Sequence, residues 1–223
     1  MHPKGIDVSV YQGEIDWRKV AASGVEWCMV KCAQGRAEAE NFSDNLNRAY
    51  ANGLRCGVYH FLTARNEAEC ELELDFLLSL LVRYRPMIRL YVCLDVESGK
   101  LPTDRAVLTR MIDNAYRRIE AEGYRCIIYT NLNWLRTRLE LGDKRLWLAW
   151  WRNPERVPVQ ADCPSGRLTL WQWGSSQVDG VRSAVDCDFM LVPEAEEREE
   201  SLSLEQKVEA LWKKVFGEGI TLA

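Results

Sequence analysis

The sequence lacks the features that mark several common classes of protein. No apolar run approaches the roughly 20 residues that a membrane-spanning helix needs. Lys and Arg together number 29 against 33 for Asp and Glu, so the basic excess typical of nucleic-acid-binding proteins is missing. The N-terminus lacks the charged and apolar regions of a secretory signal. We therefore expect no nucleic acid and no membrane as partners, and a location in the cytoplasm.

Cysteine is present, but it is not spaced as metal ligands are. The eight cysteines are scattered, and most fall within apolar, strand-like runs. Cys28 and Cys32 share one face of a candidate strand but would lie roughly 13 Å apart, which is too far for a disulfide. The sequence therefore predicts reduced, buried cysteines, no metal and no cofactor.

Residues 1–140 alternate short apolar runs with longer segments of helical period. Repeated strand–helix units of this kind predict a parallel sheet with crossover helices. The expected strands are Gly5–Val10, Glu26–Ala33, Arg55–Phe61, Leu90–Glu97 and Arg125–Thr130. The expected helices are Trp17–Ser23, Phe42–Asn52, Glu67–Tyr84, Asp104–Glu122 and Leu132–Glu140.

Two of these helices carry apolar stripes suited to packing on a sheet. The third has Leu72, Phe76 and Leu80 at four-residue spacing. The stripe of the fourth consists of Leu108, Ile112, Ala115 and Ile119.

From Lys144 onward the pattern changes. Leu146–Trp151, Leu168–Gly174 and Val185–Leu191 favour strands, but the links between them are rich in Pro, Gly and Ser and leave little room for helices. Eight strands with five helices predict an α/β barrel over residues 1–192 whose last third lacks outer helices. This is short for a complete eightfold α/β barrel, which typically needs about 250 residues.

The C-terminal part reads differently from the barrel. Residues 193–203 are Glu-rich and predict an acidic linker. Residues 204–217 predict a short amphipathic helix whose stripe is Leu204, Val208, Leu211 and Val215, widened by Trp212 and Phe216. A helix this short is marginal alone in water, so we expect it either to dock on the barrel or to form a homo-oligomer.

The most informative feature is the acidic pair Asp95 and Glu97 at the end of an apolar run. Residues i and i+2 of a strand point to the same face, so the two carboxyl groups project together. Like charges in one site push one pKa up, which places a proton donor beside an ionised carboxylate, as glycoside hydrolysis requires. A solvated pair and a metal site of a glycosyltransferase remain as alternatives.

Other acids and aromatic residues belong to the same predicted strand ends. Asp7 and Asp186 lie on the first and last strands, and functional residues of α/β barrels occupy the C-terminal ends of strands, so all four acids can face one mouth. Aromatic rings on the strands can supply the apolar surfaces and hydrogen-bond donors of a sugar groove, namely Tyr59, Tyr129, Trp147, Trp151 and Trp171. His60 faces away from Tyr59 by strand parity, and we expect it to be packed in the core.

A series of short stretches between residue 5 and about residue 192 resembles the glycoside hydrolase family 25 lysozymes. These are the N-acetylmuramidases of the Chalaropsis type, which are common among bacteriophage endolysins. The stretches that carry the resemblance are Gly5–Ser9, Gln12–Gly13, Ile15–Trp17, Val30–Lys31, Gln34–Gly35, Gly57–Phe61, Leu94–Glu97, Ile128–Thr130, Leu146–Ala149, Trp171–Gln172 and Val185–Asp186.

The resemblance implies a TIM-like (β/α)5β3 barrel that hydrolyses the β-1,4 bond between N-acetylmuramic acid and N-acetylglucosamine in peptidoglycan. In the family pattern Glu97 matches the general acid and Asp95 the carboxylate on the opposite face of the sugar, with Asp7 and Asp186 as flanking acids. The candidate substrate-binding residues are Tyr59, Tyr129, Trp147, Trp151 and Gln172. Whether Asp95 attacks carbon or steadies the acetamido group of the substrate is open, and our hypothesis is substrate assistance with retention.

The resemblance also implies a biological setting, in which an endolysin waits in the cytoplasm until a separate membrane pore releases it to the cell wall. Two competing classes remain. One is a non-catalytic peptidoglycan-binding module of the same fold. The other is a metal-dependent transferase, which ranks last because the matched stretches offer no His or Asn cluster.

Overall fold

The computed structural model describes residues 2–192. The expected acidic linker and the expected amphipathic helix lie outside the described residues. Within them, strands form a sheet in the order β1-β9-β8-β7-β6-β5-β4-β2-β3, and a β1–β2 pairing closes it. Because β3 (Ala37–Glu38) is a two-residue edge strand, the other eight form the barrel. This part of the chain is therefore a mixed α/β fold with an eight-stranded barrel.

The barrel strands run parallel except for the last. β9 (Val185–Met190) pairs antiparallel with both β8 and β1. The parallel strands are β1 (Lys4–Val8), β2 (Trp27–Gln34), β4 (Arg55–Phe61), β5 (Ile88–Asp95), β6 (Cys126–Asn131), β7 (Arg145–Ala149) and β8 (Arg167–Ser176). Each expected strand is present, with ends that shift by at most two residues.

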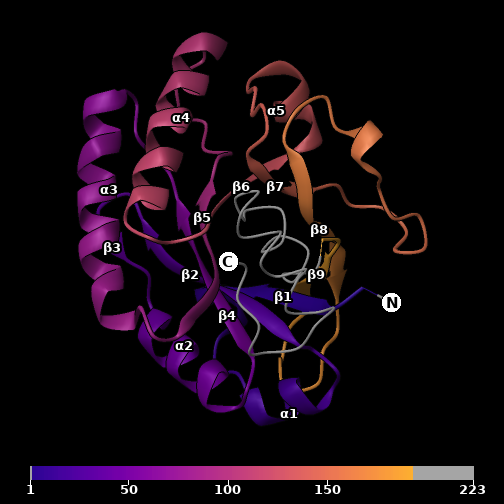
Figure 1. Ribbon diagram of the computed structural model, residues 1–223. Helices are drawn as coiled ribbons and strands as arrows, with labels where there is room; N and C mark the ends of the chain where they lie inside the picture. Colours follow the sequence, from indigo (N-terminus) through magenta and orange to yellow (C-terminus); the bar gives the residue numbers. More distant parts are fainter. Residues whose placement is uncertain (1, 193–223) are drawn as a thin grey trace, which may run out of the picture. The chain divides into compact units, whose positions relative to one another are not determined.

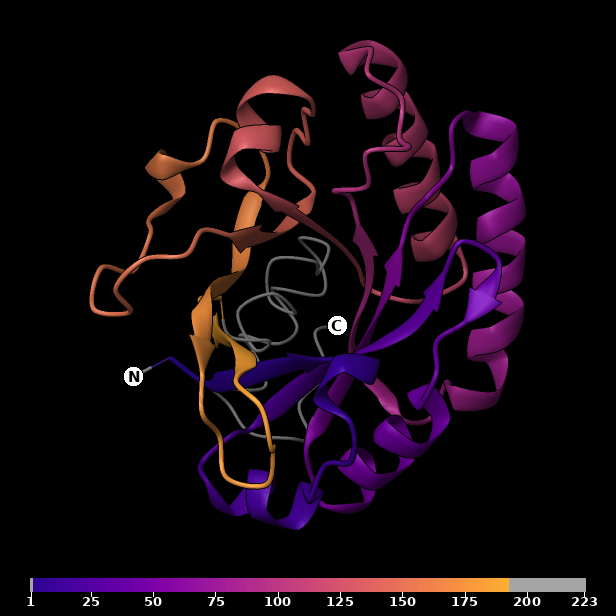
Figure 2. The same ribbon diagram turned by 180° about the vertical axis from the view of Figure 1, so that it is seen from behind.

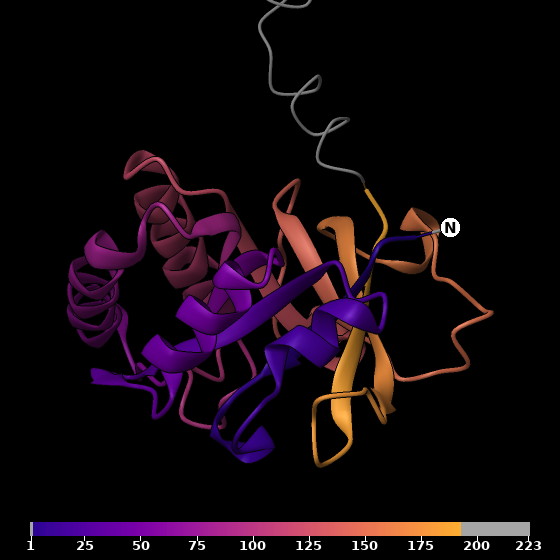
Figure 3. The same cartoon turned by 90° about the horizontal axis from the view of Figure 1, so that it is seen from below.

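The helices cover one side of the barrel. They are α1 (Trp17–Ala22), α2 (Phe42–Ala51), α3 (Glu67–Leu81), α4 (Arg105–Ala121) and α5 (Leu132–Thr137). Long helices α3 and α4 stand side by side outside the sheet (Figure 1), whereas loops and one short 3₁₀ turn, Gln160–Asp162, flank the outer side of β8 and β9 (Figure 2). The same contrast is visible from below (Figure 3).

Among residues 2–192, no helix is long and apolar enough to cross a membrane.

Helix packing agrees with the expected stripe in one case and departs from it in another. On α4, all four expected residues are buried, and the Asp104 side chain caps the first turn by accepting from the Val107 amide at 2.9 Å. On α3, the expected stripe is wrong at Leu72, which is 48% exposed. The buried face of α3 instead includes Cys70, Glu73, Leu74 and Leu77. The Glu73 carboxylate is hydrogen-bonded in a core position, and a search for apolar periodicity does not reveal such a position.

The barrel interior is filled by large side chains. Trp27, Met29, Tyr91 and others form an inner cluster that is separate from the layer between sheet and helices. Two glycines make room for this cluster, since a Cβ on Gly5 would lie 2.2 Å from the Trp27 ring and one on Gly57 would lie 2.4 Å from Met29 Sδ.

All eight cysteines are free, and all except Cys163 are buried, as expected.

We expect Gly57→Ala to destabilise the fold by about 1–3 kcal/mol, because the new methyl group would also meet the Tyr91 carbonyl oxygen at 2.8 Å, and backbone cannot move aside easily. Denaturant unfolding measures the change in the free energy of unfolding. Gly99→Ala is the matched control, since no atom lies within 4 Å of its added Cβ. Equal stability of the two variants would contradict this account of the barrel interior.

Candidate functional site

A pocket of about 420 Å³ opens at the end of the barrel where the parallel strands terminate. All four predicted acids line it, together with three of the predicted aromatic residues. The lining consists of Asp7, Ser9, Tyr11, Gln12, Lys31, Gln34, Tyr59, Phe61, Asp95, Glu97, Tyr129, Trp147, Gln172 and Asp186. Residues that are far apart in the sequence therefore share one cavity.

Asp95 and Glu97 occupy different positions relative to their strand. Asp95 is the last residue of β5 and is 6% exposed, whereas Glu97 lies two residues beyond the strand and is exposed. The expected strand Leu90–Glu97 is thus two residues too long at this end. The amide of Val96 still donates to the Tyr129 carbonyl at 2.9 Å, so extended pairing continues past Asp95 and both acids reach the pocket.

Asp7 and Asp186 come from neighbouring strands and lie in register with each other. Asp7 is near the C-terminal end of β1, as expected. Asp186, however, is the second residue of β9, so its expected place at a C-terminal strand end is wrong. Because β9 runs antiparallel, its beginning rather than its end lies at the mouth.

Burial raises the pKa of every acid in this group. For Asp95 the rise comes from burial and then from Glu97, and for Glu97 it comes from burial and then from Asp186. Burial and Asp186 raise the pKa of Asp7 to about 7. The Lys31 ammonium opposes the rise for both Asp95 and Glu97. The pocket therefore retains protons at pH values where free carboxyl groups are ionised.

A fifth acid, Asp188, was missed in the sequence. It is 1% exposed and accepts from Trp147 Nε1 at 2.7 Å, and it lies close enough to Asp7 for the two carboxyl groups to influence each other's pKa. Burial and the charge of Asp7 raise the pKa of Asp188, which favours a retained proton on this carboxyl group. The i, i+2 spacing from Asp186 was the available signal, since it places both side chains on one face of β9.

The aromatic candidates divide into three groups. Tyr59, Tyr129 and Trp147 line the pocket, and the Trp147 ring meets Tyr129 edge-on at a centroid distance of 4.8 Å. Trp151 follows β7 as a 60% exposed side chain outside the lining. Trp171 does not contribute to the groove, because its indole donates to the Trp150 carbonyl and its ring lies beside Phe189.

Gln172 is a hub of hydrogen bonds within the protein. Its Nε2 donates to Asp7 Oδ2 at 2.8 Å, and its Oε1 accepts from the Tyr129 hydroxyl at 3.0 Å and from Trp151 Nε1 at 2.9 Å. The side chain is 3% exposed. Gln172 therefore orients three candidate residues and has little surface left for a ligand.

Lys31 and His60 lie on opposite sides of the barrel wall. Lys31 is the one cationic residue among those that line the pocket, and its Nζ donates to Gln34 Oε1 at 2.9 Å. His60 is fully buried outside the pocket, as expected, with Nε2 at 3.0 Å from Glu73 Oε2. Within the described residues, no three His, Cys, Asp or Glu side chains are grouped so as to hold a metal ion.

Comparison with known proteins matches residues 6–181 to the family described as Glycosyl hydrolases family 25. The chain is 28% identical over 197 residues to lysozyme M1 of Streptomyces globisporus, covering 82% of this chain and 66% of that protein. It is 26% identical over 189 residues to the autolytic lysozyme of Clostridium acetobutylicum, covering 83% and 55%. Among solved structures, the autolysin LytC of Streptococcus pneumoniae in complex with a synthetic peptidoglycan ligand superposes with a TM-score of 0.71 at 23% identity, covering 83% and 46%.

We expect Asp188→Asn to raise the stability at alkaline pH. A protein that holds an acid with a raised pKa loses stability as the pH rises. The loss begins near pH 4, where the acid ionises in the unfolded chain, and continues until the pH passes the folded-state pKa. An amide in this position donates to Asp7 without titrating, so we expect a gain of about 1–3 kcal/mol near pH 8 and a smaller gain near pH 4.

Thermal unfolding across this pH range measures the gain, with the exposed Asp143→Asn as the matched control. A pH-independent effect of Asp188→Asn would show that Asp188 carries no retained proton.

Proposed function

Because the chain belongs to glycosyl hydrolases family 25, we propose that it is a lysozyme that cleaves the β-1,4 bond between N-acetylmuramic acid and N-acetylglucosamine in peptidoglycan. The single observation that carries the proposal is the convergence of Asp7, Asp95, Glu97 and Asp186 on one pocket whose walls are partly aromatic. Both curated relatives are lysozymes, although each is longer than this chain.

Glu97 and Asp95 differ in ways that suit unequal roles. The pKa of both acids is raised, so the difference lies in access: Glu97 is the exposed acid, and we assign it as the general acid that protonates the leaving oxygen. Asp95 is buried, and its Oδ1 has no hydrogen-bond partner among the described residues. That oxygen is available to accept the N–H of the acetamido group of the substrate while the acetamido oxygen attacks carbon.

The remaining site residues support this pair. Asp7 accepts a hydrogen bond from Gln172 on the β1 side of the pocket, and Asp186 lies beside it. Tyr59, Tyr129 and Trp147 supply ring surface to the bound sugar. Gln172 acts on substrate through the residues that it orients.

We further propose that the barrel is of the (β/α)5β3 type, on the basis of five helices that follow its first five strands in the chain. The division into a barrel over residues 1–192, an acidic linker over 193–203 and a helix over 204–217 stays a prediction. The same holds for self-association through that helix and for release to the wall through a separate membrane pore.

We expect Glu97→Gln to lower the rate of turbidity clearing of purified cell walls by about 10²–10⁴-fold, because the amide cannot protonate the leaving oxygen. Asp95→Asn is expected to lower it as well. The exposed Glu26→Gln is the matched control and is expected to clear walls as the wild type does. Equal clearing by wild type and Glu97→Gln would overturn the catalytic assignment and favour a non-catalytic glycan-binding module.

Substrate assistance predicts retention of configuration, since two successive displacements occur at the anomeric carbon. Proton NMR of the products in the first minutes is expected to show the β-anomer before mutarotation. An initial α-anomer would exclude both direct attack by Asp95 and assistance by the acetamido group.

A further inference from the structure

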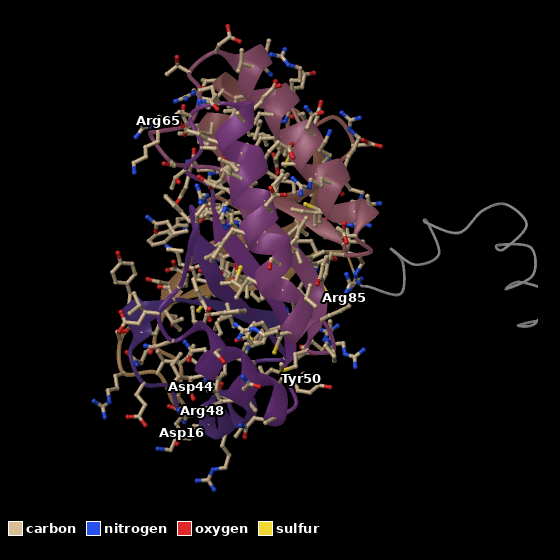
Figure 4. All side chains as sticks on the ribbon, turned by 90° about the vertical axis from the view of Figure 1, so that its left-hand side faces the viewer. Asp16, Asp44, Arg48, Tyr50, Arg65 and Arg85 are labelled. Atoms are coloured by element: carbon tan, nitrogen blue, oxygen red, sulfur yellow. The ribbon has the colours of Figure 1, made fainter. Side chains whose placement is uncertain are left out.

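Exposed aromatic side chains are rare on the described surface, and two of the three flank the candidate pocket. The exposed fractions are 85% for Tyr11, 60% for Trp151 and 39% for Tyr50. Burying an aromatic ring is energetically favourable, and a ring exposed to water lacks this gain. Exposed rings beside a cavity therefore point to a ligand that covers them. Tyr50 lies on α2, on the helix-covered side of the barrel (Figure 4), and does not line the pocket.

The turn that carries Tyr11 is fixed by its own hydrogen bonds. It is the 3₁₀ helix η1 (Val10–Gln12), which follows β1 directly. Ser9 and Gln12 cap it reciprocally, with the Ser9 amide donating to Gln12 Oε1 at 2.8 Å and the Tyr11 amide donating to Ser9 Oγ at 3.3 Å. Gly13 ends the turn at φ +61°. Tyr11 therefore projects from a defined backbone, and it is one of the residues that line the pocket.

Trp151, on another part of the rim, is also held in a defined orientation by a hydrogen bond. Its Nε1 donates to Gln172 Oε1, and Gln172 in turn donates to Asp7 in the pocket. The hydrogen bond sets the orientation of the indole while its ring stays 60% exposed. One edge of Trp151 is thus tied to the site, and its ring surface remains available.

The barrel order separates the two rings. β1, which leads to Tyr11, and β7, which leads to Trp151, are separated by β9 and β8 in one direction and by β2, β4, β5 and β6 in the other. β5, which ends in Asp95, lies on the longer arc between them. A chain of sugars that passes over the acids can therefore contact Tyr11 on one side and Trp151 on the other.

We propose that Tyr11 is a sugar-binding platform at the β1 rim and that the glycan strand crosses the mouth between Tyr11 and Trp151. This inference rests on the proposed function and extends it to a substrate that occupies several sugar sites. The ring of Tyr11 stacks on a sugar remote from the cleaved bond. Its contribution is to binding rather than to the chemical step.

The test compares Tyr11→Ala, Tyr11→Phe and Tyr50→Ala on soluble glycan strands of about eight sugars released from purified walls. Tyr11→Ala is expected to raise KM about tenfold with kcat within a factor of two, because uniform binding is lost. Tyr11→Phe keeps the ring and is expected to restore KM. Tyr50→Ala is expected to behave as the wild type. An unchanged KM for Tyr11→Ala, in a protein whose wild type hydrolyses the strands, would overturn the platform and leave the proposed function intact.

Binding measured in a Glu97→Gln background separates the two proposals. The same octasaccharides are expected to bind about tenfold more weakly when Tyr11→Ala is added. Adding Trp151→Ala as well is expected to multiply the two losses, since the rings contact different sugars. If the wild type hydrolyses nothing but binding still depends on Tyr11, the proposed function fails and the platform stands. Equal affinity with and without Tyr11→Ala would overturn the platform.

Discussion

The antiparallel pairing of β9 with both β1 and β8 is the constraint on which the rest of the site depends. It completes the barrel next to β1 and brings the first residues of β9, rather than its last, to the mouth. Asp186 and Asp188 thereby lie beside Asp7, although more than 170 residues separate them in the chain. A parallel last strand would carry these acids toward the opposite end of the barrel and leave Asp7 without its partners.

Concentrating acids in this way opposes stability. Each buried carboxyl loses hydration, and its neighbours carry the same charge, so the pKa of each is raised. The surrounding polar groups offset part of the cost: Gln172 and Trp147 donate to the carboxylates, and Lys31 supplies one positive charge. A site that holds protons on some acids and charge on others is what acid–base chemistry at a glycosidic bond requires.

Gln172 links the pocket to its rim. Through one buried amide, the orientation of Asp7 is coupled to that of Tyr129 and of the exposed Trp151. Tyr11 on the other side is set by the capped turn after β1, which only Ser9 separates from the strand that bears Asp7. The proposed binding surface and the proposed catalytic acids are therefore positioned by the same strands, so a sugar chain that contacts both rings is placed relative to the acids.

The sequence by itself determined the local elements: apolar alternation, helical period and capping residues such as Asp104 specify strands and helices from interactions within a few residues. It also marked Asp7, Asp95, Glu97 and Asp186, because i, i+2 parity and strand ends are local properties. Only the tertiary structure decided the direction of β9, the hydrogen bonds of Gln172, the burial of Asp188 and the exposure of Tyr11. These depend on which strands become neighbours when the barrel closes, and contacts between distant segments leave no period in the chain.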